Sequence, residues 1–167
     1  MKFSCEKALL QSMIAIASRA VAPKSTIPAL EGVLLEAEQE LNLTGYNLKT
    51  GIRGTISADI SEPGSIVLSA RLFGDIIRRL PDDVVTLSTN DLMVNITCGM
   101  SEFNILGIDP SQFPELPAVE YQNSMILPQR ILHSMITETI FAVSTNDSRP
   151  IHTGELFERD GVGMLTV

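Results

Sequence analysis

Residues 24–45, KSTIPALEGVLLEAEQELNLTG, have a counterpart in residues 146–167, NDSRPIHTGELFERDGVGMLTV. The two stretches align without a gap when 122 is added to each residue number, so that Pro28 matches Pro150 and Gly32 matches Gly154. About one aligned residue in four is identical. The identities continue upstream, where Leu10 matches Leu132, Ser12 matches Ser134, Met13 matches Met135, Ile14 matches Ile136, Ala20 matches Ala142 and Val21 matches Val143. This internal repeat predicts one complete unit followed by the first part of a second.

Hydrophobic periodicity predicts the elements of the first unit. A short strand opens the chain, and an apolar stripe at helical spacing follows over residues 6–21 until Pro23 and Pro28 end the helix. Short β-rich runs follow between residues 32 and 70, and residues 50–60, TGIRGTISADI, are predicted to form a single strand. A second helix over residues 70–80 and three more strands come next. The order strand, helix, three strands therefore occurs twice, which predicts an α+β domain of two similar halves over residues 1–108.

The hydrophobic periodicity stops at residue 109 and begins again after residue 122. Residues 109–122 hold three prolines and three acidic residues without periodicity, which indicates a linker or crossover. A strand and a third helix over residues 129–143 follow, so residues 123–167 are predicted to be the incomplete beginning of a second domain.

Composition points to a folded, cytoplasmic chain. Of the 167 residues 44% are hydrophobic, no run approaches the roughly 18 apolar residues of a membrane span, and the N-terminus resembles no signal peptide. Cys5 and Cys98 lie in apolar contexts without metal-ligand spacing, so both are predicted to be buried thiols.

The charges are segregated along the chain. Twelve Lys and Arg residues against twenty Asp and Glu residues give a net charge of −8, which by itself argues against a nucleic-acid partner. The helices and the loop after the first helix are nevertheless basic, with Lys7, Arg19, Lys24, Arg71, Arg78, Arg79 and Arg130 against Glu6, Asp75 and Glu138. A basic helix face on an acidic body would attract a polyanion to one place, although ordinary solvated helix faces also explain the pattern.

The sequence shows no pattern of a catalytic, metal or cofactor site. It contains no Walker-type or GxGxxG loop, and His133 and His152 have no partners at a recognisable motif spacing. Ser144, Asp147 and His152 could be imagined as a triad, but a loop rich in Ser, Thr, Asn and Asp is more simply a turn. The prediction is a binding protein that is not an enzyme and needs no cofactor or metal.

Several motifs together resemble the beta subunit of bacterial DNA polymerase III, the sliding-clamp family. They are TIPALEGVLLE, LNLTGYNL, QFPELP and FAVSTNDSRPIHTGELFE. The resemblance covers the whole chain and implies a DNA-clamp fold, with helices on one face of the sheets, that corresponds to domain one and the beginning of domain two. It also implies a homodimeric processivity factor for DNA replication, with duplex DNA, the polymerase and the clamp loader as partners.

The resemblance assigns roles to particular residues. The loop after the first helix of each repeat would face the DNA, so Lys24, Asn146 and Arg149 are expected at phosphates, with Arg71, Arg78 and Arg79 adding positive field. His152 would stand at the first wall of a partner-peptide cleft.

Two regions are expected to self-associate. Residues 101–107, where Phe103 and Ile105 alternate with Asn104, resemble the strand that pairs across the ring interface, and Ile76 and Leu80 are expected nearby. Met135 on the third helix would join two copies of residues 123–167. The alternative function is a truncated clamp-like module that only self-assembles and does not bind DNA.

Overall fold

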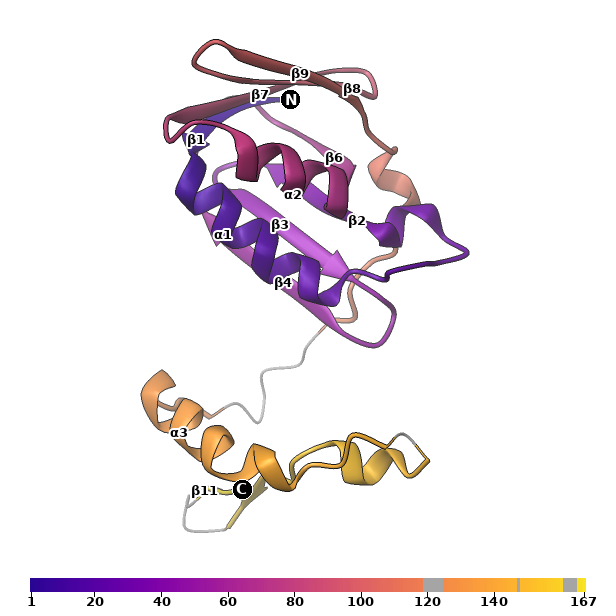
Figure 1. Cartoon of the computed structure of the whole chain (residues 1–167), viewed down its shortest axis with the longest axis vertical. Coiled ribbons are helices and arrows are strands. Elements are labelled where there is room, and N and C mark those ends of the chain that lie inside the picture. The colour runs from indigo at the N-terminus through magenta and orange to yellow at the C-terminus, as the bar shows by residue number, and fades with distance from the viewer. Residues whose placement is uncertain (119–124, 147, 161–164) are drawn as a thin grey trace. The chain divides into compact units, whose positions relative to one another are not determined.

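The computed structural model describes residues 1–118, 125–146, 148–160 and 165–167. Contacts divide the chain into a first unit, Met1–Pro117, and a second unit, Ala118–Val167 (Figure 1). The boundary lies beyond the predicted domain end at residue 108. Residues 109–117, expected in a linker, belong to the first unit because Phe113 and Leu116 pack in a small apolar cluster there. No helix in the described part of the chain is long and apolar enough to cross a membrane.

The first unit contains two halves with the same order of elements. The first half comprises β1 (Lys2–Glu6), α1 (Lys7–Ala17), β2 (Gly32–Ala37), β3 (Leu41–Tyr46) and β4 (Gly51–Ile56). The second half comprises β6 (Gly64–Ser69), α2 (Ala70–Arg79), β7 (Val84–Asn90), β8 (Met93–Cys98) and β9 (Ser101–Leu106). The predicted order of elements is confirmed, but the run predicted as one strand at residues 50–60 divides into β4 and β5 (Asp59–Glu62), which join different sheets.

Each half gives its first strand to the sheet of the other half. The five-stranded sheet has the order β5-β1-β7-β8-β9, and the four-stranded sheet has the order β4-β3-β2-β6. β1 pairs antiparallel with β7, with Phe3 opposite Leu87, and β6 pairs antiparallel with β2, with Ile66 opposite Leu35. Because a buried backbone needs hydrogen-bond partners, neither half completes its sheet alone.

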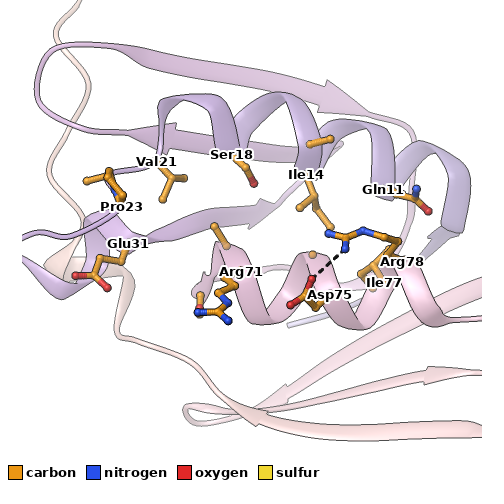
Figure 2. Close-up of a pocket in the computed structure, with 15 residues that line it drawn as sticks. Gln11, Ile14, Ser18, Val21, Pro23, Glu31, Arg71, Asp75, Ile77 and Arg78 are labelled. Carbon is orange, nitrogen blue, oxygen red and sulfur yellow. Dashed lines mark ion pairs between the residues drawn. The ribbon is translucent and has the colours of Figure 1, made fainter.

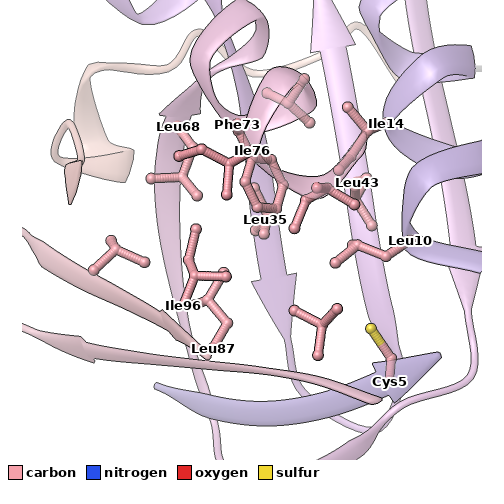
Figure 3. Close-up of a cluster of buried hydrophobic side chains, with 14 of the residues drawn as sticks. Cys5, Leu10, Ile14, Leu35, Leu43, Leu68, Phe73, Ile76, Leu87 and Ile96 are labelled. Atoms are coloured by element: carbon pink, nitrogen blue, oxygen red, sulfur yellow. The ribbon is translucent and has the colours of Figure 1, made fainter. Parts of the chain in front are cut away.

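The main core lies where the two sheets and the two helices meet (Figure 3). α1 buries residues spaced three or four apart, which is the stripe that a helix presents to a core. Phe73 of α2 is fully buried between side chains of both sheets, among them Leu35 and Ile96. The core therefore fixes α1 and α2 next to each other.

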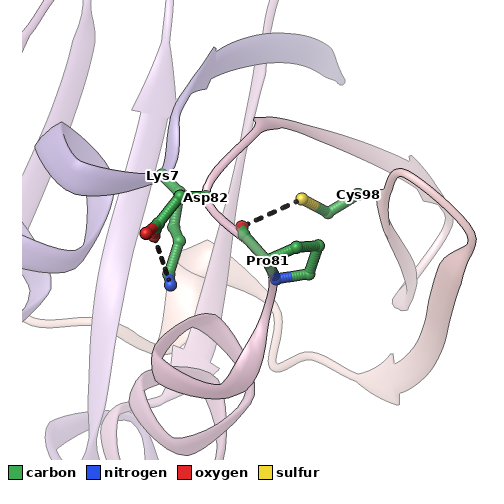
Figure 4. Close-up of polar contacts among 4 residues, drawn as sticks. All are labelled: Lys7, Pro81, Asp82 and Cys98. Carbon is green, nitrogen blue, oxygen red and sulfur yellow. Dashed lines mark hydrogen bonds and ion pairs between the residues drawn. The ribbon is translucent and has the colours of Figure 1, made fainter.

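Both cysteines are buried free thiols, as predicted. Burial, assisted by the nearby Glu6 carboxylate, raises the pKa of Cys5 to about 11. Burial also raises the pKa of Cys98, whose Sγ donates a hydrogen bond to the carbonyl oxygen of Pro81 at 3.5 Å (Figure 4). Thiols held neutral in this way are poor nucleophiles.

The second unit repeats the beginning of the first. It contains α3 (Gln129–Thr139), the 3₁₀ turns η4 (Ile140–Ala142) and η5 (Pro150–Thr153), and the two-residue strands β10 (Glu158–Arg159) and β11 (Leu165–Thr166). α3, η4 and η5 begin and end 122 residues after α1, η1 (Ser18–Ala20) and η2 (Pro28–Glu31). The hydrogen bond from Ala22 N to Leu30 O also recurs, from Ser144 N to His152 O. The repeat inferred from the sequence is therefore confirmed for these elements.

The strands of the second unit are shorter than predicted. Residues 125–128, the described part of the counterpart of β1, form no strand, and β10 covers only the end of the counterpart of β2. In the first unit β1 pairs with β5 and β7, and β2 pairs with β6 as well as β3. The described residues of the second unit include no counterpart of β5, β6 or β7.

Candidate nucleic-acid interface

A groove of about 660 Å³ lies between α1 and α2 of the first unit. Gln11, Ile14 and Ser18 line one side of it, and Arg71 and Arg78 line the other (Figure 2). The helices run antiparallel, so that Gln11 lies near Arg78 and Ser18 lies toward Arg71. Gly74 of α2 faces Ile14 of α1, because a Cβ atom at Gly74 would lie 3.5 Å from Ile14 Cγ2.

The sequence of α2 sets the direction of its arginines. Ser69 caps the helix by accepting a hydrogen bond from the Leu72 amide to its Oγ at 3.4 Å. Phe73 and Ile77 turn toward the core, and Arg71 and Arg78, seven residues apart, therefore lie on one exposed face two turns apart.

The charges in the groove are partly balanced. Arg78 forms an ion pair with Asp75 at 3.2 Å, and Glu31, which also lines the groove, accepts a hydrogen bond from the Ser25 amide at 2.9 Å. The positive excess of α1, α2 and the loop after α1 comes from Arg71, which lines the groove, and from the exposed residues Arg19, Lys24 and Arg79, which do not line it.

Lys7 does not add to this excess. Its Nζ forms an ion pair with Asp82 at 2.8 Å, in the turn after α2 (Figure 4). The hydrogen bond and the charge of Lys7 lower the pKa of Asp82. The ammonium group of Lys7 therefore forms an ion pair that links the two halves of the first unit.

The structure places two of the six predicted DNA contacts at the groove. Arg71 and Arg78 line the groove, and the exposed Lys24 follows Pro23 at its end. Arg79 is exposed on the last residue of α2 but lies outside the groove.

The other two predicted contacts, Asn146 and Arg149, are exposed in the second unit. The Asn146 side-chain oxygen accepts a hydrogen bond from the Ser148 amide at 2.9 Å, and the Arg149 carbonyl oxygen accepts one from the His152 amide at 3.0 Å. Both residues therefore take part in local hydrogen bonds of the second unit.

The predicted self-association surface of the first unit needs correction. Ile76, Leu80 and Ile105 are buried in the main core and offer no exposed apolar surface. Ile105 lies opposite Val94 of β8, and Ile76 is on the buried face of α2. Phe103, which is 39% exposed on β9 at the edge of the five-stranded sheet, is the one of these four residues that remains available.

Two predicted residues lie in the second unit. Met135 is half-buried on α3, and His152 is exposed in η5, where its counterpart Leu30 in the first unit is buried. The exposure of His152 is compatible with a wall of a cleft, which stays a prediction.

Sequence reasoning missed the polar and acidic lining of the groove. Gln11 and Ser18 are seven residues apart on either side of the buried Ile14, and this spacing was a readable sign that they share one edge of the helix. The approach of Glu31 to the groove had no such signal, because it depends on the loop between α1 and β2.

Comparisons with known proteins agree with this architecture. Residues 1–117 match the family model described as DNA polymerase III beta subunit, N-terminal domain. The beta sliding clamp of Staphylococcus aureus strain Mu50 is 39% identical over 164 aligned residues, which cover 92% of this chain and 44% of the relative. That of Staphylococcus epidermidis is 38% identical over the same shares. The chain thus spans less than half the length of these relatives.

Solved structures give the same result. A putative DNA polymerase III beta subunit from Eubacterium rectale has a TM-score of 0.89 and 38% identity, and the match covers 96% of this chain and 44% of that one. The DNA polymerase III beta subunit of Pseudomonas aeruginosa has a TM-score of 0.90 and 29% identity over the same shares. The two exchanged sheets, the paired helices and the repeat after residue 122 accordingly have the sliding-clamp fold, and the chain belongs to the DNA polymerase III beta subunit family.

Proposed function

We propose that this chain serves as a sliding-clamp subunit, which holds duplex DNA without reading its sequence and tethers a replicative polymerase. The observation that carries the proposal is the placement of Arg71 and Arg78 at one groove, with Lys24 at its end, on a chain of net charge −8. Such a surface attracts phosphates and leaves the acidic remainder to repel them. The role is one of binding, not catalysis, and a DNA partner implies the cytoplasm as the compartment.

Lys24, Arg71 and Arg78 would contact phosphates, and Arg79 would add to the positive electrostatic potential. Asn146 and Arg149 would make the equivalent contacts in the second unit, as the offset of 122 relates Asn146 to Lys24. Contacts of this kind position the duplex and carry no base information.

Binding to DNA should therefore depend on salt and not on sequence. We expect the protein to retain two long duplexes of unrelated sequence equally well at low salt and to release both as salt is added, because each neutralised phosphate releases counterions. Fluorescence anisotropy of the duplex, or retention of the protein on surface-bound duplex, would measure the binding at each salt concentration. Retention of only one duplex, or retention that resists salt, would contradict the proposed role.

Assembly belongs to the same proposal. The relatives are more than twice as long as this chain, so the ring, the homodimer, the clamp loader and the polymerase are inferred partners. A cleft for partner peptides with His152 at its first wall is inferred on the same basis. Residues 1–117 would act as domain one and residues 125–167 as the beginning of domain two.

The open edge of β9 is expected to mediate contact between first units. Phe103 presents apolar surface there, and no described strand pairs with the outer edge of β9. Phe103→Asp should reduce association measured by sedimentation at high protein concentration. The control is Leu48→Asp, which removes an exposed apolar side chain from the turn between β3 and β4 and should have no effect. Equal association of both variants would show that β9 is not part of the interface.

A second candidate function, a module that only self-assembles, is favoured by the exposed apolar residues of the second unit, among them Phe141 and Leu156. A protein that associates but does not retain any duplex at low salt would support it.

A further inference from the structure

The loop between α1 and β2 carries Lys24, the expected phosphate contact at the end of the groove. Main-chain hydrogen bonds close this loop at its base. The Ala22 amide donates to the Leu30 carbonyl oxygen at 3.0 Å, and the Leu30 amide donates to the Ile27 carbonyl oxygen at 3.1 Å. Neither bond involves Lys24 or the residues on either side of it, so the direction of the Lys24 side chain depends on further contacts.

The carboxylate of Glu31 makes such a contact. Its Oε1 accepts a hydrogen bond from the Ser25 amide at 2.9 Å, and the Ser25 Oγ in turn accepts one from the Ile27 amide at 3.1 Å. Glu31 is the last residue of η2, in which Ala29 and Leu30 are buried in an apolar cluster. The middle of the loop is therefore tied to a packed part of the first unit.

The hydrogen bond to Ser25 restrains the backbone of Lys24. The Ser25 amide and the Lys24 carbonyl group belong to one planar peptide group, so a partner that holds the amide also holds the plane that follows Lys24. On the other side of Lys24, the ring of Pro23 fixes the φ angle of that residue. These two restraints together limit the directions in which the Lys24 side chain can point.

The charge of Glu31 opposes the function proposed for the groove. Glu31 lines the groove, as Arg71 does (Figure 2), and a carboxylate repels the phosphates that an arginine attracts. Within the described part of the chain, Glu31 forms no ion pair that would offset this repulsion. Its charge does strengthen the hydrogen bond from Ser25, because bonds to ionised acceptors are stronger than bonds to neutral ones.

The second unit holds the equivalent point of its loop in another way. Asn146 is the counterpart of Lys24, and its own side-chain oxygen accepts the hydrogen bond from the Ser148 amide. A lysine cannot do this, because an ammonium group only donates. At the position of Glu31 the second unit has Thr153, whose hydroxyl forms its hydrogen bond within η5. The acidic residue is thus found in the loop whose expected phosphate contact cannot accept a hydrogen bond.

We propose that Glu31 is a positioning residue for Lys24. It holds the Ser25 amide and thereby directs the Lys24 ammonium group toward the phosphates of a duplex, without contacting DNA itself. This role rests on the proposed DNA-binding function and deepens it, because it explains an acidic side chain at a surface for a polyanion. It involves only residues of the first unit.

Two substitutions of Glu31 separate its charge from its hydrogen bond. Glu31→Gln and Glu31→Ala remove the same charge, but only Glu31→Gln keeps an oxygen that can accept from the Ser25 amide. We expect Glu31→Gln in the full chain to bind a long duplex at low salt about two- to tenfold more tightly than Glu31→Ala, the range expected for one hydrogen bond. Fluorescence anisotropy of a labelled duplex measures both affinities.

The same comparison without Lys24 identifies the residue through which Glu31 acts. In the Lys24→Ala background the two Glu31 variants should bind equally, because no ammonium group is left to direct. The matched control is Glu38→Gln against Glu38→Ala. Glu38 is exposed in the turn between β2 and β3, and its carboxylate accepts no hydrogen bond from the residues that the structure describes, so these variants should also bind equally. A difference between the Glu31 variants that persists in the Lys24→Ala background would overturn the proposal.

Amide hydrogen exchange at Ser25, followed by NMR without DNA, tests the hydrogen bond itself. Exchange should be faster in Glu31→Ala than in Glu31→Gln. Equal exchange, or equal duplex affinity of the two variants while the unaltered chain retains the duplex, would overturn the positioning role alone. An unaltered chain that retains no duplex would contradict the proposed function and the positioning role with it, whereas the exchange rate at Ser25 would still show whether Glu31 holds the loop.

Discussion

Replacing Phe73 with alanine is expected to lower the free energy of unfolding of the first unit by about 3 to 5 kcal/mol. The side chain is fully buried on α2 and contacts the core built by both sheets. Its removal leaves a cavity that the strand-exchanged sheets cannot close by moving a single element. Urea unfolding of the full chain, followed by far-ultraviolet circular dichroism, measures the change as a shift of the midpoint.

The adjacent residue gives the matched control. Leu72 is on the same helix but is 47% exposed, so Leu72→Ala keeps the backbone and the helix propensity while it removes little buried surface. Its expected cost is below about 1 kcal/mol. Similar losses for the two variants would mean that α2 does not bury its Phe73 face as described.

The repeat and the helices could be predicted because their signals are local or periodic. Ile14 and Ile136 both belong to apolar stripes at helical spacing, and identities such as Pro28 and Pro150 hold the two repeats in register. The structure accordingly begins and ends α3 at the offset of α1.

The exchange of strands could not be predicted from such signals. Nothing in the sequence states that β1 pairs with β7, because pairing between distant strands depends on the whole topology. The same holds for the contact of Lys7 with Asp82, which are 75 residues apart, and for the split between β4 and β5.

For the same reason, some residues of the candidate site could be placed from the sequence and others could not. The spacing of Arg71 and Arg78 was enough to place them on one face of α2. Ile105 was expected at an exposed edge, because strand alternation alone does not say which face the core covers. Its pairing with Val94, a buried residue of β8, decides that it turns inward.

Reversal of two charges at the groove should have the second large effect. The double variant Lys24→Glu with Arg78→Glu places two negative charges where phosphates are expected to approach. It also leaves Asp75 without its ion pair. We expect the affinity for a long duplex at low salt to fall about tenfold or more, and the logarithmic salt dependence to become shallower by about one to two units.

The control has the same change in net charge on other surfaces. Lys2→Glu with Arg53→Glu also replaces one lysine and one arginine, and Arg53, like Arg78, forms an ion pair, with Glu36 at 2.7 Å. Lys2 precedes the buried Phe3 on β1, and Arg53 lies opposite Thr44, the residue of β3 that follows the core residue Leu43. Because successive strand residues point to opposite faces of a sheet, Lys2 and Arg53 point away from the main core. This variant should keep most of the affinity.

The most direct test of the clamp role is the retention of a long duplex at low salt by these two variants and the unaltered chain. We expect the unaltered chain and the Lys2→Glu, Arg53→Glu variant to retain the duplex, and the Lys24→Glu, Arg78→Glu variant to release it. Equal retention by both variants would contradict a DNA-binding role for the groove between α1 and α2.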